Sequence, residues 1–227
     1  PVTGEERTFR AEADFSTEPG LLLRTALIDP DETNAFRRIH GASDGQAGWY
    51  VDRLGDFLLS QSNGPLSMTQ REALEQWRRT FGLRGAYHKI LRRRVGQATV
   101  TENSPEWILG DRIKDSFVVR ENGLSFELSF AEGYSVGLFL DQRENRRRVL
   151  TGHVAAGFPL YAEGLLDAEI LNAFAYTCGF SVCAAKNAAR VTSLDLSRKY
   201  LDWGKRNFVL NALDPSEHEF IYGDAFD

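Results

Sequence analysis

The clearest change of hydrophobic period along the chain lies between residues 168 and 195. An apolar run ends in a turn at Tyr176–Gly179, which is how a buried strand ends when a turn follows. From there, apolar residues recur at helical spacing, namely Phe180, Cys183, Ala184 and Ala188. A second apolar run then contains Val191 and Leu194 and stops at Asp195. The pattern predicts a strand, a glycine-containing turn, a helix, and a second strand with an acidic residue at its end.

This order of elements is typical of a βαβ unit that binds a nucleoside. The turn would bring backbone N–H groups to a ligand at the helix N-terminus, and the carboxylate of Asp195 would accept hydrogen bonds from both ribose hydroxyls. A pyrophosphate needs a G-x-G-x-x-G cradle, whereas this turn offers only Gly179. A nucleoside without phosphates, such as S-adenosylmethionine (SAM), fits better. The alternative is that Asp195 is a surface residue that caps the next helix.

The pattern continues beyond Asp195 with a second helix and a third strand. Ser197 is placed to cap a helix that runs to about Asn211, whose buried side is expected to consist of Tyr200, Leu201 and Phe208. A strand over 219–222 then ends at Gly223–Phe226. Asp224 at this tip is a candidate contact for the exocyclic amine of an adenine. The alternative is an ordinary turn aspartate.

The first half of the chain shows the pattern of an α+β module. Gly55 lies within a hairpin signal, Asn122-Gly123 forms a stronger one, and Ser67 with Gln70 has the spacing of a capping box. The expected strands cover 33–40, 49–62 as a hairpin, 86–90, 107–113 and 116–120, and the expected helix covers 67–81. We therefore expect three parts: a lead-in segment over 1–20, a central α+β domain over 21–123, and the first part of a nucleoside-binding domain over 124–227.

The stretch between these domains is rich in arginine. Asp141 is placed to cap a helix that carries four arginines, Arg143, Arg146, Arg147 and Arg148, although it could equally contact a ligand. The arginines form either a basic face for a substrate or a solvated face paired with Glu144. Residues 151–166 are expected to form a loop.

Composition limits the classes of function. The chain has 227 residues, 42% of them hydrophobic, and a net charge of −5, so no global electrostatic attraction to nucleic acid is expected. Local contacts could come from Arg92, Arg93 and Arg94, which are a candidate for binding phosphates, although most such charge runs are solvated faces. No apolar run approaches the ~20 residues of a membrane span. Two cysteines suit a reducing cytosol, and their spacing is no metal motif, so we expect a cytoplasmic protein without a metal.

Taken together, these motifs resemble one family. Residues 137–146 are similar to its G-x-F-L-D-x-R-x-x-R element, and residues 171–181 to its L-N-x-F-x-Y-T-G-G-F-S motif. Residues 191–197, 207–211 and 223–226 follow at the expected spacings, and Thr33–Arg37 with residues 43–53 resemble the family's central domain. The chain thus resembles the class I SAM-dependent methyltransferases related to the 23S rRNA cytosine-5 methyltransferases, over roughly residues 20–227.

The resemblance implies a Rossmann-like α/β core, preceded by a small α+β domain, and a SAM site. Its cofactor contacts would be Asp141, Arg143, Asn172, Phe174, Tyr176, Thr177, Cys178, Gly179, Phe180, Asp195, Ser197, Asp224 and Ala225. It also implies rRNA as substrate, with carbon 5 of a cytosine favoured. A homodimer is left open.

The sequence departs from the family pattern in three ways. Cys178 replaces a glycine in the loop expected beside the methionine part of SAM. The family's N-terminal RNA-binding domain is not recognised, and its Asp-Pro-Pro motif and catalytic cysteine would lie beyond Asp227. The core would then end after the third strand, with the 168–173 strand as an apolar edge, so a fragment is expected, or another element that covers this edge.

Transfer to carbon 5 of cytosine needs a thiolate nucleophile and a base. Cys178 lies at a helix start, where the helix dipole lowers a thiol's pKa, but it is expected to face the cofactor rather than the base. Cys183 is expected in the core, so the sequence assigns no nucleophile. The alternatives to an RNA methyltransferase are a SAM-dependent methyltransferase of a small molecule or protein, and a non-catalytic RNA-binding module that keeps the fold.

Overall fold

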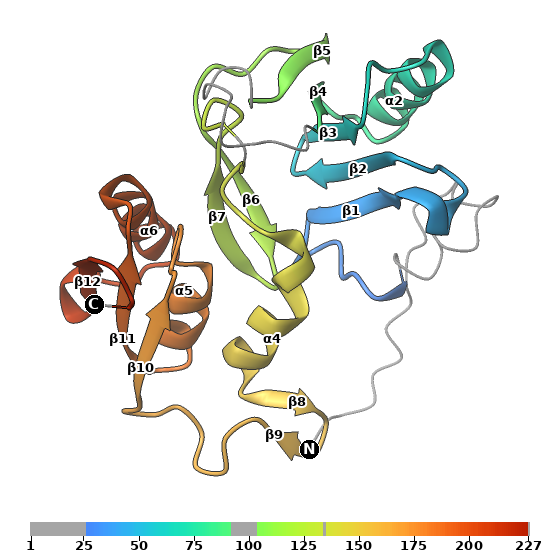
Figure 1. Cartoon of the computed structure of the whole chain (residues 1–227). Helices are drawn as coiled ribbons and strands as arrows, with labels where there is room; N and C mark the ends of the chain where they lie inside the picture. Colours follow the sequence, from blue (N-terminus) through green and yellow to red (C-terminus); the bar gives the residue numbers. More distant parts are fainter. Residues whose placement is uncertain (1–25, 92–103, 134, 227) are drawn as a thin grey trace.

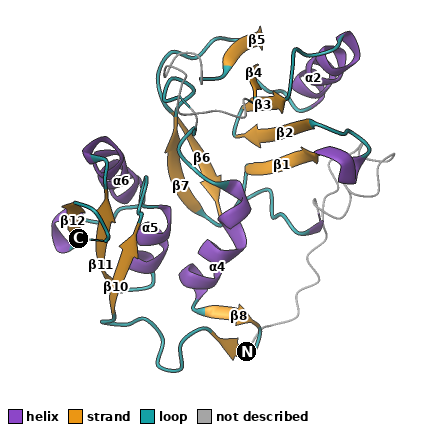
Figure 2. Cartoon of the chain, in the orientation of Figure 1, coloured by secondary structure: helices purple, strands orange, loops and turns teal. Residues whose placement is uncertain are grey.

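The computed structural model describes residues 26–91, 104–133 and 135–226. It places a mixed five-stranded sheet with one covering helix in one half of the molecule and a three-stranded parallel sheet with two helices in the other. A two-stranded hairpin and helix α4 (Arg143–Thr151) lie between the two halves (Figures 1 and 2). The arrangement confirms the predicted α/β class with a parallel sheet.

The five-stranded sheet has the order β1-β2-β3-β4-β5. Its strands are β1 (Ala35–His40), β2 (Trp49–Leu54), β3 (Phe57–Ser62), β4 (Gly85–Ile90) and β5 (Glu106–Gly110). Helix α2 (Met68–Thr80) connects the one parallel pair, β3 and β4. The predicted capping box is present, since Ser67 Oγ accepts from Gln70 N at 3.2 Å and Gln70 Oε1 accepts from Ser67 N at 2.9 Å.

Both faces of this sheet are buried, because apolar side chains at consecutive positions, such as Leu58 and Leu59, point to opposite sides. One face packs on α2 through a cluster that includes Trp49, Leu58 and Leu74. The other face contributes Leu54, Phe57 and Leu59 to a larger cluster that extends into the second half of the molecule. The sheet is therefore a shared layer between α2 and the rest of the chain.

The hairpin is formed by β6 (Phe117–Glu121) and β7 (Leu124–Leu128) around Asn122 and Gly123. Both turn residues have positive φ, 52° and 77°, which is the conformation that favours Asn-Gly in a two-residue turn. The predicted hairpin is thereby confirmed.

Helix α6 (Arg198–Leu210) covers the free edge of β7 with side-chain amides. Asn207 Oδ1 accepts from Glu127 N at 2.9 Å, and Asn211 both accepts from Ser125 N and donates to Ser125 O. These bonds satisfy backbone groups that an edge strand would otherwise expose.

The parallel sheet has the order β10-β11-β12, with β10 (Glu169–Ala173), β11 (Arg190–Asp195) and β12 (Glu219–Tyr222). Helix α5 (Gly179–Lys186) connects β10 to β11, and α6 connects β11 to β12. Among the described residues β10 pairs with β11 alone, and Leu171 on β10 is 65% exposed. The predicted succession of three strands and two helices is confirmed, although α5 ends before Ala188, which lies in a turn with φ 63°.

The arginine-rich stretch differs from its prediction in two respects. Asp141 lies inside a 3₁₀ turn, η3 (Leu140–Gln142), and Gln142 occupies the N-cap of α4 without a side-chain hydrogen bond, so the capping role predicted for Asp141 is wrong. Residues 151–166, expected to be a loop, contain a short antiparallel pair, β8 (His153–Ala155) and β9 (Phe158–Pro159). A pair this short has too few residues to show a period of two.

Candidate functional site

The predicted cofactor residues collect at one edge of the parallel sheet. Because β10, β11 and β12 run in the same direction, their C-terminal ends meet there. Residues 174–180 follow β10, residues 195–197 end β11, and residues 223–226 follow β12. Ligands of open α/β sheets bind at this edge.

Asp195 faces the bend formed by residues 174–180 after β10. Its Oδ2 accepts from Tyr176 N at 2.8 Å, and its Oδ1 accepts from Ser197 N at 2.9 Å. No ion pair involves this carboxylate in the described part of the chain, and the residue is half-buried. Each carboxylate oxygen has two lone pairs and so retains one for a ligand hydroxyl. The Asp195 carboxylate therefore keeps acceptor capacity beside the bend.

The bend itself holds an unusual backbone conformation. Phe174, Tyr176 and Cys178 all have positive φ, between 49° and 61°, a region that residues with a Cβ rarely adopt. Neighbouring groups hold it in place, since Thr177 Oγ1 donates to Gly137 O at 2.5 Å and Asn207 Nδ2 donates to Thr177 O at 2.9 Å. Strain of this kind concentrates at ligand-binding loops.

The side chain of Cys178 points away from the edge where a ligand would lie. It is fully buried against α6 at Gly204, where even a Cβ atom would collide with the thiol sulfur. Burial raises the pKa of the Cys178 thiol to about 12, so the predicted lowering by the helix dipole is wrong. The space that this side chain fills belongs to the core.

Two more predicted residues have structural partners that fix their side chains. Asn172 Nδ2 donates to Ser181 Oγ at 2.8 Å, inside a buried polar group that includes Ser193. Ser197 is the N-cap of α6, as predicted, and its Oγ accepts from Tyr200 N at 3.3 Å. Gly179 and Phe180 open α5, so their backbone N–H groups lie at its N-terminus.

Residues 137–146 form a second wall beside the bend. The ring of Phe139 lies 5.3 Å from the ring of Tyr176, and the Arg146 guanidinium lies 5.7 Å from the ring of Phe180. Burial raises the pKa of Tyr176 to about 12, which keeps its hydroxyl protonated. Asp141 and Arg143, from the same stretch, line a cleft of about 570 Å³ that reaches the five-stranded sheet.

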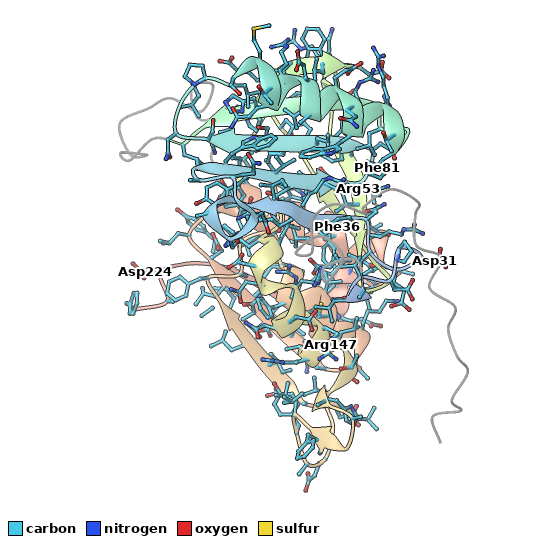
Figure 3. The ribbon with its side chains drawn as sticks, turned by 90° about the vertical axis from the view of Figure 1, so that its right-hand side faces the viewer. Asp31, Phe36, Arg53, Phe81, Arg147 and Asp224 are labelled. Carbon is cyan, nitrogen blue, oxygen red and sulfur yellow. The ribbon has the colours of Figure 1, made fainter. Side chains whose placement is uncertain are left out.

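The tip of β12 is the most exposed part of the edge. Asp224 Oδ1 accepts from Phe226 N at 3.0 Å, the bond of a turn aspartate, which is the alternative that the sequence left open. The ring of Phe226 lies 5.7 Å from that of Phe174, so the tips of β12 and β10 are neighbours. Figure 3 shows Asp224 at the margin of the molecule, on the side opposite Asp31.

The arginine run of α4 does not act as one basic face. Arg147 and Arg143 pair with Glu144, as one of the two alternatives predicted. Arg146 instead forms a buried ion pair with Glu121 that neither alternative anticipated. Arg92, Arg93 and Arg94 lie outside the described residues.

Over the described ranges 26–91, 104–133 and 135–226, no group of three or more His, Cys, Asp or Glu side chains could hold a metal ion. None of the helices there is long and apolar enough to cross a membrane.

Comparison with known proteins connects this geometry to a family. The sequence profile of the S-adenosylmethionine-dependent methyltransferases matches residues 46–227. The chain belongs to this family. The predicted family membership and the family's cofactor class are thereby confirmed.

Individual proteins similar to this methyltransferase chain agree with the family match. A protein of Deinococcus radiodurans named ribosomal RNA large subunit methyltransferase is 34% identical over 221 residues, which are 92% of this chain and 50% of that protein. A Streptococcus mutans structure assigned as a SAM-dependent methyltransferase is 27% identical, with a TM-score of 0.72 over 90% of this chain and 50% of that one. The structure of SMU.776, described as a methyltransferase complexed with SAH, has a TM-score of 0.73 and 27% identity over 90% of this chain and 49% of its own. The chain thus spans about half the length of the proteins it matches.

Sequence reasoning missed two groups that shape the site. Asn207 holds both the bend and β7, and Glu121 neutralises Arg146 behind the bend. Asn207 lies in the 207–211 motif segment, whereas no motif or local period marked Glu121, since contacts across 25 to 80 positions leave no local signal.

Proposed function

We propose that this chain binds SAM at the C-terminal edge of its parallel sheet and takes part in methylating large-subunit rRNA, with carbon 5 of a cytosine as the favoured acceptor, in the cytoplasm. The observation that carries the proposal is the pair of hydrogen bonds from Tyr176 N and Ser197 N to Asp195. These two hydrogen bonds hold the Asp195 carboxylate beside a strained bend, in a member of the SAM-dependent methyltransferase family. The name of the Deinococcus radiodurans relative supports rRNA as the substrate.

The residues fit the parts of SAM. Asp195 would accept the ribose hydroxyls, the N–H groups at the start of α5 lie beside the bend that would hold the methionine part, and Asp224 and Ala225 would border the adenine. Phe174, Leu196 and Phe226 expose large apolar surfaces at this edge that suit an aromatic base. Asp141, Arg143, Asn172 and Tyr176 to Phe180 complete the proposed set. When bound, SAM supplies an electrophilic methyl group.

The chain's own residues then orient the methyl donor relative to its acceptor. Alignment of two reactants can supply a large part of a rate enhancement, and the rigid bend provides that alignment. Neither cysteine is a nucleophile in this proposal, because both thiols are buried and burial raises the pKa of each to about 12. A thiolate for carbon 6 of cytosine is therefore not assigned to the described residues.

Calorimetric titration with SAM tests the cofactor proposal. The wild-type chain should bind SAM, and Asp195→Asn should weaken binding about tenfold or more, since a charged acceptor of two hydrogen bonds is lost. Asp202→Asn, an exposed carboxylate on α6, is the matched control and should leave the affinity unchanged. Unchanged affinity in Asp195→Asn, or no binding by the wild type, would refute the ribose assignment.

The acceptor is tested with rRNA transcripts that carry tritium at carbon 5 of cytidine. Replacement of that hydrogen by a methyl group releases tritium to water, whereas methylation at any other atom retains it. Label from methyl-tritiated SAM that enters RNA without release from carbon 5 would reject the cytosine assignment. Label that enters only protein or small molecules would reject RNA as the substrate.

A further inference from the structure

One face of the five-stranded sheet changes character along its strands. Toward the N-terminal ends of β3 and β4 it is apolar and packs Phe57, Leu59 and Tyr87 into the larger core cluster. At the other end the same face carries Arg37, Asp52, Gln61 and Lys89, which line the cleft that also contains Asp141. Burying polar side chains on a sheet face lowers stability unless they are hydrogen-bonded, so the partners of these side chains decide what this end of the face can do.

Asp52 is the centre of this polar end. It accepts from Arg37 Nε at 2.8 Å, from Arg37 Nη2 at 3.1 Å and from Gln61 Nε2 at 3.0 Å, and its side chain is 6% exposed. Arg37 lies opposite Asp52 in the β1–β2 register, so the pair is built into the sheet. The Gln61 amide is therefore oriented by a fixed partner, with its carbonyl oxygen directed away from Asp52.

Lys89 adds a buried cation beside Gln61. The two residues are register partners in the parallel β3–β4 pair, and Lys89 is 5% exposed. Burial lowers the pKa of the Lys89 ammonium to about 8. A Gln amide and a lysine side by side offer donors and an acceptor in a fixed arrangement.

The opposite wall of the cleft comes from the stretch that packs on the cofactor bend. It includes Phe139, which is half exposed and contacts Tyr176, and Asp141, whose charge contributes to raising the pKa of Arg37. Phe36, from β1, also lines the cleft, and Figure 3 shows it where the sheet meets the half of the molecule that carries α4. The cleft thus has aromatic rings near its polar floor and lies next to the proposed SAM site.

We infer that this cleft receives the nucleotide to be methylated, with Gln61 and Lys89 contacting the polar edge of its base and Phe36 or Phe139 contacting the ring. The inference rests on the proposed function and names the acceptor side of that site. A base outside its stack is recognised by in-plane hydrogen bonds and by aromatic contact, which are the two kinds of group the cleft combines. Its volume of about 570 Å³ is in the range of pockets for small ligands.

The experiment measures RNA binding and cofactor binding separately, without relying on turnover. The probe is a large-subunit rRNA transcript that carries no methyl groups and contains 5-bromocytidine, in the presence of SAH. Irradiation should crosslink the RNA to peptides that contain Phe36 or Phe139. Gln61→Glu, which keeps the volume of the side chain, and Lys89→Met should each weaken RNA binding about tenfold and leave SAM affinity within about twofold of wild type.

Arg79→Met is the matched control for charge. It removes one positive charge from α2, on the other side of the sheet, where the side chain is 74% exposed. An equal loss of RNA affinity in Arg79→Met would overturn the inference, since the effect would then be general electrostatics. Crosslinks confined to peptides outside the cleft would overturn it too, even with SAM binding intact. If the wild-type chain does not bind SAM, that result would instead count against the proposed function.

Discussion

Arg146 on α4 and Glu121 on β6 form a bidentate ion pair in the interior of the protein. Arg146 Nε donates to Glu121 Oε1 at 2.6 Å and Nη2 to Oε2 at 2.9 Å, with side-chain exposures of 3% and 1%. Arg146 Nη2 also donates to Phe139 O at 2.7 Å. The pair joins the hairpin to the stretch that forms the second wall of the cofactor bend.

We expect Arg146→Met to lower the free energy of unfolding by about 3–5 kcal/mol, because it leaves Glu121 buried without a counter-charge. The double variant Glu121→Leu/Arg146→Met should recover much of that loss, since no charge then remains buried. Urea denaturation measures both. Arg147→Met is the control, because Arg147 pairs with the exposed Glu144 and such pairs contribute about 0–1 kcal/mol. A single Arg146→Met variant as stable as Arg147→Met would contradict the assignment.

A second prediction concerns Gly204, a glycine in the middle of α6. Alanine is normally about 1 kcal/mol better than glycine inside a helix, but a Cβ at this position would collide with the sulfur of Cys178. Gly204→Ala should therefore lower the melting temperature by several degrees, at about 2–4 °C per kcal/mol for a chain of this size.

Cys178→Gly in the same chain should restore stability, because it removes the clashing sulfur and suits the φ of 61° at that position. Gly64→Ala is the control, since a Cβ there meets no atom within 4 Å. Equal melting temperatures for Gly204→Ala and the double variant would show that Cys178 is not the obstacle.

A third prediction concerns thiol reactivity. Burial raises the pKa of both Cys178 and Cys183 to about 12, so roughly one thiol in ten thousand is ionised at pH 8. The native protein should therefore react with Ellman's reagent only at its unfolding rate, whereas the urea-unfolded chain should react at once with two equivalents, one for each cysteine in the sequence. Rapid reaction of one equivalent in the native protein would show an accessible, activated thiol.

A fourth prediction is a pH dependence of stability from Lys89. Burial lowers its pKa from 10.5 to about 8 in the folded protein, so between these values the unfolded chain binds more protons. The free energy of unfolding should therefore rise as pH increases from about 8 to 10.5. Below pH 8 the buried ammonium lowers that free energy by its full amount. Urea denaturation of wild type and Lys89→Met at pH 7 and pH 10 should show the advantage of the methionine variant shrinking as pH rises. A constant difference would mean that Lys89 titrates normally.

Local signals along the chain were sufficient for much of the fold. The Asn122-Gly123 hairpin, the Ser67 capping box and the Ser197 cap each depend on neighbouring residues, and each is present. The edge position of β10 in the parallel sheet was expected from the family resemblance and not from a local signal, and β10 pairs with β11 alone among the described residues. The predicted extent of α5 was less accurate, since the helix ends at Lys186, two residues before Ala188.

Long-range contacts explain what the sequence did not reveal. A helix N-terminus normally activates a thiol, yet Cys178 packs on a glycine 26 positions later in the sequence and loses contact with water. Arg146 was grouped with its charged neighbours, although its partner is 25 residues away. In both cases a burial that depends on tertiary packing outweighed the local rule.

Asn207 couples the β6–β7 hairpin to the bend after β10. Its single amide group accepts from the backbone of β7 through one atom and donates to the backbone of the bend at Thr177 through the other. A sliding motion of the hairpin along α6 must stretch one of these bonds or carry Thr177 with it. Binding to the five-stranded sheet that shifts the hairpin would therefore also displace Thr177 at the proposed SAM site.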